Sequence, residues 1–183
     1  ILDGDGKVVA LGHPHLWLNS MGKTTIGNIY MTADGNWRAL KVTGSGRYGG
    51  PVTFLPGARF EGRNRTAACN GAPVQIQGGQ TVFQNSWFGY SCKNPTGVME
   101  NDGGHIMQTA GDVILDGCFY EHSASGPGAQ LEWPLVYTTG GRTIASKNLL
   151  GSGDAGYPAN PRFRQAGSGE VIILDSLGTK LTA

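Results

Sequence analysis

Six glycine-led phrases recur along this chain and share one pattern of residue types. Each phrase has a glycine, a short run of β-forming residues, a polar turn and a further apolar residue. The six copies begin at Gly22, Gly57, Gly79, Gly111, Gly141 and Gly169. These glycines are 35, 22, 32, 30 and 28 residues apart, and a period of this size with strand chemistry in every copy is typical of a solenoid. The repeat therefore predicts that equivalent positions stack in columns.

Alignment of the copies on their glycines predicts which residues form those columns. The column three positions after the glycine holds Thr25, Phe60, Val82, Ile114, Ile144 and Ile172. The column eight positions after it holds Tyr30, Arg65, Trp87, Phe119, Leu149 and Leu177. Both columns are rich in the residue types that suit a pleated, buried surface, so we expect both to lie in the interior.

One position after the glycine, three copies carry charges of alternating sign. These residues are Asp112, Arg142 and Glu170. Because neighbouring strands lie about 4.8 Å apart, we expect a ladder of opposite charges on the outside of a sheet. A second strand-like run precedes several phrases, as at 74–77 and 106–109. The predicted unit is therefore strand, glycine turn, strand, polar turn and a loop of varying length.

The composition agrees with a turn-dense β protein. Glycine supplies 31 of the 183 residues, and the formal net charge is only +1. This charge gives no electrostatic reason to expect nucleic acid or an anionic membrane as a partner. No apolar run approaches the roughly 18 residues of a membrane span, so we expect no membrane insertion. We divide the chain into a strand-and-turn lead-in, 1–21, and the repeat region, 22–183. Since it begins with Ile1 rather than Met, we expect a processed or excised part of a longer chain.

Motifs for other functions fail on their spacing. Gly22-Lys23-Thr24 ends like a phosphate-binding loop, but Trp17 stands where the first glycine of that loop should be. His13 and His15 have no third ligand nearby in the sequence. We therefore expect neither a cofactor nor a metal ion. Cys118 falls within the repeat, where a packed thiol is expected rather than a reactive one.

The chemistry-bearing side chains gather around the loops between the middle copies. The candidate catalytic residues are Glu100, Asp102, Glu121, His122 and Glu132. The candidate substrate-binding residues are Trp87, Tyr90, Tyr120, Trp133, Arg142 and Tyr157. Because the loops leave consecutive turns, we expect them to crowd on one flank and wall a groove. Flat aromatic faces beside carboxylates suit sugar rings, which have apolar faces and hydroxyl rims.

Strand register gives the candidate carboxylates a measurable geometry. Carboxylates on adjacent turns would be about 4.8 Å apart and those two turns apart about twice that, close to the roughly 5 Å and 6.5–9.5 Å of retaining and inverting glycosidases. Glu121 is the first choice because it directly follows the strand-like run 118–120. The sequence does not choose its partner among the other three acidic candidates. His122 or Arg142 beside such a pair would instead fit a lyase.

Two repeat phrases resemble the rungs of a known superfamily. Residues 113–120 (Val-Ile-Leu-Asp-Gly-Cys-Phe-Tyr) and 82–88 (Val-Phe-Gln-Asn-Ser-Trp-Phe) resemble rungs of right-handed parallel β-helices of the pectate-lyase-like superfamily. The irregular copy lengths and long loops are similar to bacteriophage tailspikes, which are homotrimers that bind and often depolymerise bacterial surface polysaccharide. The resemblance covers most of 22–177. It implies an all-β, right-handed parallel β-helix of about six irregular rungs, with long loops on one flank.

Two strands are apolar at successive positions, which favours a trimer. Residues 113–115 and 171–174 do not alternate, although a strand with one wet face should. Some of these side chains then face outward and need cover, from another subunit or from a covering segment, and the subunits of a homotrimer would supply it.

Three functions are open. The favoured one is the β-helical part of a phage tailspike in the virion tail, which binds capsule or O-antigen and depolymerises it endolytically as a glycoside hydrolase or polysaccharide lyase. The second is a secreted, extracellular, monomeric lyase or glycoside hydrolase. The third is a non-catalytic structural or adhesin segment. The sequence neither names the polysaccharide nor decides between hydrolysis and elimination.

Overall fold

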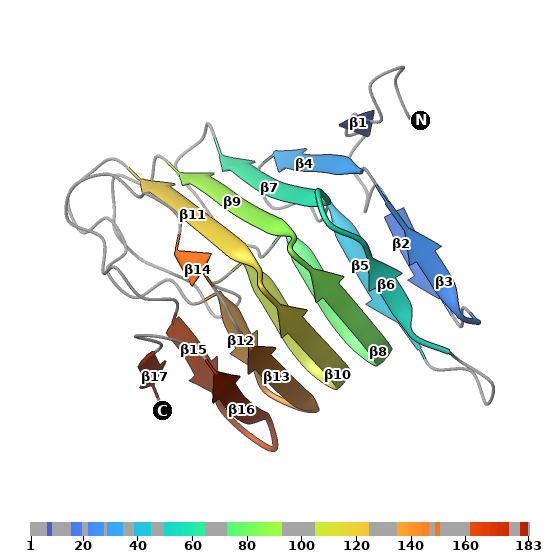
Figure 1. The fold of residues 1–183 in the computed structure, drawn as a ribbon. Coiled ribbons are helices and arrows are strands. Elements are labelled where there is room, and N and C mark those ends of the chain that lie inside the picture. The colour runs from blue at the N-terminus through green and yellow to red at the C-terminus, as the bar shows by residue number, and fades with distance from the viewer. Residues whose placement is uncertain are drawn as a thin grey trace.

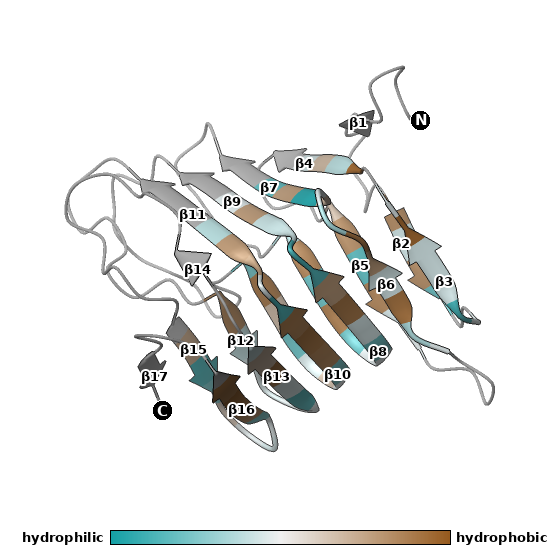
Figure 2. Ribbon diagram, in the orientation of Figure 1, coloured by the Kyte–Doolittle hydropathy of each residue, from teal (hydrophilic) through white to brown (hydrophobic). Residues whose placement is uncertain are grey.

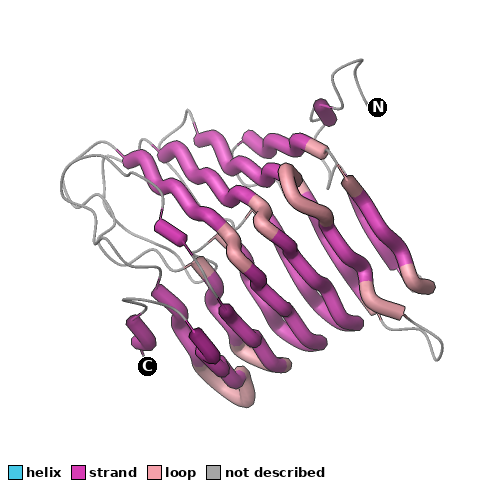
Figure 3. Tube along the Cα trace, in the orientation of Figure 1, coloured by secondary structure: helices cyan, strands magenta, loops and turns pink. Residues whose placement is uncertain are grey.

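The computed structural model describes twelve parts of the chain, to which all structural statements below refer. These parts are residues 7–8, 16–19, 22–27, 29–34, 39–44, 50–64, 73–92, 105–124, 135–146, 149–150, 162–175 and 180–182. Within them the chain is all-β, and Figure 3 shows strands and loops without a helix. In particular, these parts contain no helix of the length and apolarity that a membrane span requires.

The strands form two sheets. The six-stranded sheet contains, in spatial order, β1 (Lys7–Val8), β4 (Tyr30–Asp34), β7 (Arg59–Asn64), β9 (Trp87–Cys92), β11 (Phe119–Ala124) and β14 (Leu149–Leu150). The first row of the eleven-stranded sheet contains β2 (Leu16–Asn19), β5 (Leu40–Thr43), β8 (Val74–Gln84), β10 (Ile106–Asp116), β12 (Val136–Thr138), β15 (Arg162–Gln165) and β17 (Lys180–Thr182). Its second row contains β3 (Thr24–Ile26), β6 (Val52–Phe54), the carboxyl-terminal parts of β8 and β10, β13 (Arg142–Ser146) and β16 (Glu170–Asp175).

Every pairing between the described strands is parallel. Along the first row, Leu40 pairs with Val74, Val74 with Ile106 and Ile106 with Val136, so neighbours are 30 to 34 residues apart in sequence. Figure 1 shows the strands of each sheet lying side by side in chain order. An all-β chain with long parallel sheets of this kind is compatible with a β-helix.

A stacked column of glycines forms the bend between the two rows. Gly79, Gly111 and Gly141 have φ angles of 71°, 81° and 86°, in the left-handed region that favours glycine. A Cβ atom on Gly111 would lie 2.4 Å from the carbonyl oxygen of Gly79, and one on Gly141 would lie 2.2 Å from that of Gly111. The predicted glycine turn is therefore confirmed for these three copies, and at Gly111 and Gly141 a larger residue would collide with the backbone.

Phenylalanine rings fill the core between the sheets. Phe54 stacks on Phe83 with ring centroids 5.1 Å apart, and Phe60 stacks on Phe88 at 5.4 Å. The two stacks meet edge to face, at 5.1 Å between Phe54 and Phe60 and 5.1 Å between Phe83 and Phe88. All four rings are fully buried, and each such pair adds about 0.5–1.5 kcal/mol beyond burial of its area. Because two rings come from each sheet, the cluster fixes the sheets to one another.

The first predicted column exists but faces outward, which corrects the expectation of an interior stack. Val82, Ile114, Ile144 and Ile172 are in register on successive strands, and all four are half-buried. The buried positions are their neighbours, such as Val113 and Leu115. Moving by one residue along a strand changes the face. Since β10 is apolar on both faces, hydrophobicity could not choose between them, and Figure 2 shows hydrophobic residues side by side across β8 and β10.

The second column needs the same correction. Trp87 and Phe119 are in register and half-buried, whereas their neighbours Phe88 and Tyr120 are buried. The copy led by Gly57 is also displaced, because its strand enters the six-stranded sheet. There Phe60 pairs with Met31 and Phe88 rather than with Val82. The irregular copy lengths concealed this shift from the alignment, and Arg65 and Leu177 lie outside the described residues.

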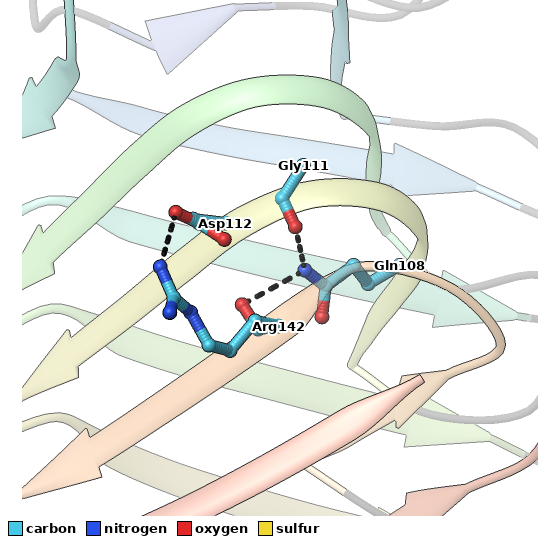
Figure 4. Close-up of polar contacts among 4 residues, drawn as sticks. All are labelled: Gln108, Gly111, Asp112 and Arg142. Carbon is cyan, nitrogen blue, oxygen red and sulfur yellow. Dashed lines mark hydrogen bonds and ion pairs between the residues drawn. The ribbon is translucent and has the colours of Figure 1, made fainter. Parts of the chain in front are cut away.

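The predicted charge ladder is confirmed. Asp112 pairs with Arg142, and Arg142 pairs with Glu170. Nη2 of Arg142 lies 3.0 Å from Oδ2 of Asp112, on side chains that are 46% and 30% exposed (Figure 4). Such an exposed pair stabilises a fold by about 0.2–1 kcal/mol. The ladder is therefore a sign of the strand register and contributes little to the free energy that holds the strands in it.

A buried glutamine ties the glycine bend together from the inside. Nε2 of Gln108 donates to the carbonyl oxygens of Gly111 at 2.7 Å and Arg142 at 3.1 Å (Figure 4). Its Oε1 accepts a hydrogen bond from Oγ1 of Thr143 at 2.5 Å. Because Gln108 is fully buried, losing these partners would leave polar atoms unsatisfied.

Two strands of the segment expected to lead into the repeat already belong to the sheets. β1 pairs with β4, and β2 pairs with β5 over four residues, from Leu16 opposite Leu40 to Asn19 opposite Thr43.

Candidate functional site

Five of the sequence-predicted site residues lie outside the described parts of the chain. They are Glu100, Asp102, Glu132, Trp133 and Tyr157. The segments that contain them connect β9 to β10, β11 to β12 and β14 to β15. The strands β9, β11 and β14 are neighbours in one sheet, and β10, β12 and β15 are neighbours in the other. The three segments therefore begin at neighbouring strands of one sheet and end at neighbouring strands of the other.

Among the remaining candidates, Trp87 lies on the outer face of the six-stranded sheet, in a line with residues that were not predicted for the site. Tyr30, Arg59, Trp87 and Phe119 are in register there on four successive strands. Cζ of Arg59 lies 6.0 Å from the ring centroid of Trp87, which is a cation–π distance. The buried residues Met31, Phe60 and Phe88 alternate with these on the opposite face. The face therefore presents aromatic and cationic groups in one line.

The indole of Trp87 lies over a glycine of its own strand. Trp87 and Gly89 are two residues apart and share a face. A Cβ atom on Gly89 would lie 1.9 Å from Cη2 of Trp87. The missing side chain thus makes room for the indole to lie along the strand. Sequence reasoning missed Gly89, although a glycine two positions after a tryptophan in a strand is the signal that could have found it.

Two glutamates flank this glycine in register. Gly89 pairs with Glu61 of β7 on one side and with Glu121 of β11 on the other. The Cα atoms of the two glutamates are therefore about 9.6 Å apart, at two strand spacings. The hydroxyl of Tyr30 donates a short hydrogen bond to Oε2 of Glu61, which is half-buried. Strand alternation puts position 121 on the same face as Phe119.

Glu61 was not among the predicted residues. Its copy, led by Gly57, is the one displaced into the six-stranded sheet, so alignment on the glycines could not place it beside Glu121. His122 of β11 is in register with Tyr90 of β9. The side chains of Glu121, His122 and Tyr90 lie outside the description.

Tyr120 and Arg142 do not join this face. Tyr120 is 6% exposed and packs edge to face on the buried His105, with ring centroids 5.2 Å apart. Its ring therefore belongs to the core of the structure. Arg142 lies on the second row of the eleven-stranded sheet, paired with Asp112. The structure thus brings Trp87 together with the backbone of Glu121, Tyr90 and His122.

Other chemistry is limited in the described parts of the chain. These parts contain no group of three His, Cys, Asp or Glu residues placed to hold a metal ion. Cys118 is fully buried, and its Sγ donates to the carbonyl oxygen of Phe83 at 3.3 Å. Burial raises the pKa of this thiol to about 12, so it is not an activated nucleophile. Comparison of the chain with family models, curated proteins and solved structures finds no match.

Proposed function

We propose that the chain is the β-helical part of a bacteriophage tailspike that binds and cleaves bacterial surface polysaccharide, either capsule or O-antigen. In this proposal, the sheet rows are faces of one right-handed parallel β-helix of about six irregular rungs. Two observations support a chain that winds around one axis. Strands from successive passages of the chain through the sheets pair in parallel, and the glycines Gly79, Gly111 and Gly141 form a column at the bend. The virion tail is the corresponding location.

The observation that carries the proposal is the outer face around Gly89. The indole of Trp87 offers an apolar surface on which a sugar ring stacks, and Arg59 and Glu61 stand beside it with groups that hydrogen-bond to hydroxyls. The lack of a side chain at Gly89 lets the indole lie on the strand between positions 61 and 121. An aromatic surface flanked by two carboxylate positions suits a saccharide that is bound and then cleaved.

For cleavage we assign Glu61 and Glu121 as an acid and base pair. Two strand spacings, about 9.6 Å between the Cα atoms, are close to the upper end of the roughly 6.5–9.5 Å separation of carboxylates in inverting glycosidases. The Tyr30 hydroxyl holds the Glu61 carboxylate as a hydrogen-bond acceptor, so Glu61 is assigned to activate water. Glu121 then protonates the glycosidic oxygen on the opposite side of the sugar ring. Elimination by a lyase is the alternative chemistry, with His122, whose backbone adjoins Glu121 on β11, as the candidate base.

Assembly as a homotrimer forms part of the proposal. The column Val82, Ile114, Ile144 and Ile172 is apolar and faces outward, and Leu174 nearby is 68% exposed. A contiguous apolar surface of this kind is expected to be covered by other subunits.

The test measures binding and cleavage with one panel of capsular polysaccharides and O-antigens. We expect reducing ends to appear, and Glu61→Gln and Glu121→Gln to lower the rate by about 10²–10⁴-fold while binding is retained. Glu170→Gln, an exposed acid on the other sheet, is the matched control. An ultraviolet-absorbing, unsaturated product would assign the chemistry to a lyase instead.

Each failure of this test has its own meaning. Unchanged rates in both glutamine variants would show that the catalytic assignment is wrong. Binding without cleavage of any member of the panel would favour a non-catalytic adhesin. Absence of binding to every member would overturn the proposed function.

A further inference from the structure

A second outer face, on the first row of the eleven-stranded sheet, carries aromatic and cationic side chains in a single register column. The column runs through Trp17, Lys41, Gln75, Met107, Tyr137 and Arg164. It crosses five strand spacings, or about 24 Å. We call it the Trp17–Arg164 column. Sequence reasoning assigned none of its members to a site.

The aromatic ring at one end of the column is exposed and yet held in one orientation. Trp17 is 60% exposed. Its indole nitrogen donates to Oγ1 of Thr43 at 2.6 Å, and that hydroxyl donates to Oδ1 of Asn19 at 3.3 Å. Burial cannot explain the fixed orientation of a ring that is mostly in water. A large apolar surface held in place in this way is a preorganised platform for a ligand.

A cation accompanies each of the two aromatic rings. Nζ of Lys41 lies 5.4 Å from the ring centroid of Trp17, and Cζ of Arg164 lies 4.8 Å from that of Tyr137. The aromatic–cation pair thus occurs at both ends of the column. Between them lie the neutral residues Gln75, which is half-buried, and Met107, which is 7% exposed, so the ring and cation at each end are the parts of the column that a ligand would contact.

The described charges on this face have one sign. Lys41 and Arg164 are cationic, whereas the acids whose side chains are described lie elsewhere. Those acids are Glu61 on the six-stranded sheet and Asp112, Asp116 and Glu170 on the second row. A negatively charged ligand would therefore meet no opposing carboxylate among the described side chains of this face, although the whole chain carries a net charge of only +1.

The charges are also sparse. Lys41 and Arg164 are four strand spacings apart, or about 19 Å. A single strand of nucleic acid presents about one phosphate per 3.4 Å in duplex geometry, and two cations along such a length would leave most phosphates unpaired. A polymer with few acidic groups and many apolar ring faces fits the column better. Acidic polysaccharides with one carboxylate per several sugars have this chemistry.

We infer that the Trp17–Arg164 column binds an acidic, sparsely charged polysaccharide, with sugar rings stacked on Trp17 and Tyr137 and acidic groups paired with Lys41 and Arg164. This inference rests on the proposed function, because it names the chemical class of the polysaccharide. It adds a second binding surface beyond the face around Gly89, so one polymer chain or two neighbouring chains contact the protein at separate places.

The experiment measures binding of the full chain to gellan and to purified acidic capsular polysaccharides, each before and after carboxyl reduction. The protein should bind an acidic polymer more tightly than its carboxyl-reduced form. The double variant Lys41→Gln/Arg164→Gln should bind the acidic form about tenfold more weakly and the reduced form unchanged. Added salt should weaken binding of the wild type more than binding of the double variant. Lys23→Gln removes an exposed lysine outside the column and should change nothing.

Trp17→Ala should weaken binding to both forms of the polymer, because the stacking platform does not depend on charge. Trp17→Phe keeps an aromatic face and should restore most of the loss. Circular dichroism verifies that the variants fold, which is expected because Trp17 and Arg164 are exposed. These two variants separate an aromatic contribution from the charge contribution.

Three results would overturn the inference. In the first, the wild type binds the acidic and the carboxyl-reduced polymer equally tightly. In the second, the double variant binds the acidic polymer as tightly as the wild type does. In the third, the wild type binds single-stranded poly(dT) more tightly than any polysaccharide. Each leaves the proposed function standing if polysaccharides are still bound and cleaved through Glu61 and Glu121. Absence of binding to every polysaccharide would remove both proposals together.

Discussion

At the residue scale, two buried polar side chains, Gln108 and Cys118, are held by groups on neighbouring strands of the stack. Gln108 of β10 bonds to Arg142 and Thr143 of β13, and Cys118 bonds to the carbonyl oxygen of Phe83 of β8. Polar atoms in a parallel stack can thus be satisfied only when successive passages are in register. A slip of one residue would break these bonds and reverse the faces of the strand.

We expect Cys118 to resist alkylation in the folded chain. Its burial raises the thiol pKa from 9.0 to about 12, so very little thiolate is present at pH 8 and no reagent reaches the sulfur. Iodoacetamide at pH 8 should leave Cys118 unmodified in buffer and modify it in denaturant, as read by mass spectrometry of the peptides. Equal labelling rates in the two conditions would contradict the burial.

The same shift predicts how stability changes with pH. A thiol whose folded pKa is raised stabilises the fold fully below its unfolded value, here 9.0, and loses that contribution as the pH rises toward about 12. Relative to a Cys118→Ala variant, the wild type should therefore lose free energy of unfolding above pH 9. The comparison with the variant cancels the titration of other groups.

At the scale of elements, the glycine bend determines how each passage turns between rows. Gly79, Gly111 and Gly141 have left-handed φ angles, and at Gly111 and Gly141 a Cβ atom would also contact the carbonyl oxygen of the preceding glycine of the column. At Gly111 and Gly141 a side chain is therefore disfavoured for two reasons, the left-handed φ angle and the lack of space for a Cβ atom.

We expect Gly111→Ala to lower the free energy of unfolding by about 3 kcal/mol, from the left-handed φ and the close backbone contact together. Gly22→Ala is the matched control, because a Cβ there meets nothing within 4 Å and should change stability little. Urea unfolding followed by circular dichroism compares the two. Equal midpoints for both variants would show that the bend tolerates a side chain.

How far the sequence predicts this structure depends on what each residue type reveals. The charges of Asp112, Arg142 and Glu170 revealed the register because opposite signs are favourable only between neighbours. The apolar run Val113–Leu115 of β10 indicated that strands stack, but it did not indicate which of its side chains face the core, since Ile114 is as apolar as its neighbours. Glu61 could not be found, because its approach to Glu121 depends on the displaced copy led by Gly57.

At the scale of the whole molecule, the outward apolar column sets the expected assembly. Ile114 and Ile144 are half-buried on the outside of the second row, beside the exposed charges of Arg142 and Glu170. An apolar line bordered by charges resembles the centre and rim of a subunit interface.

We expect the wild type to sediment as three chains and Ile114→Asp to sediment as one, because a buried charge without a partner opposes association. Thr109→Asp places the same charge at an exposed position of β10 outside the apolar column and should leave the assembly intact. Light scattering after size exclusion measures the mass, with circular dichroism as the check on folding. A wild type of single-chain mass would instead favour the secreted monomeric enzyme.

The alternation of buried and outward residues along β7, β9 and β11 also has an evolutionary consequence. Phe60 and Phe88 hold the core, while Arg59 and Trp87, their immediate neighbours in sequence, contribute nothing to it. Substitutions at the outward positions can then accumulate at little cost to folding, and under the proposed function a change of the polysaccharide would select among them. Descendants of such a chain would be expected to keep the phenylalanines and diversify the residues between them.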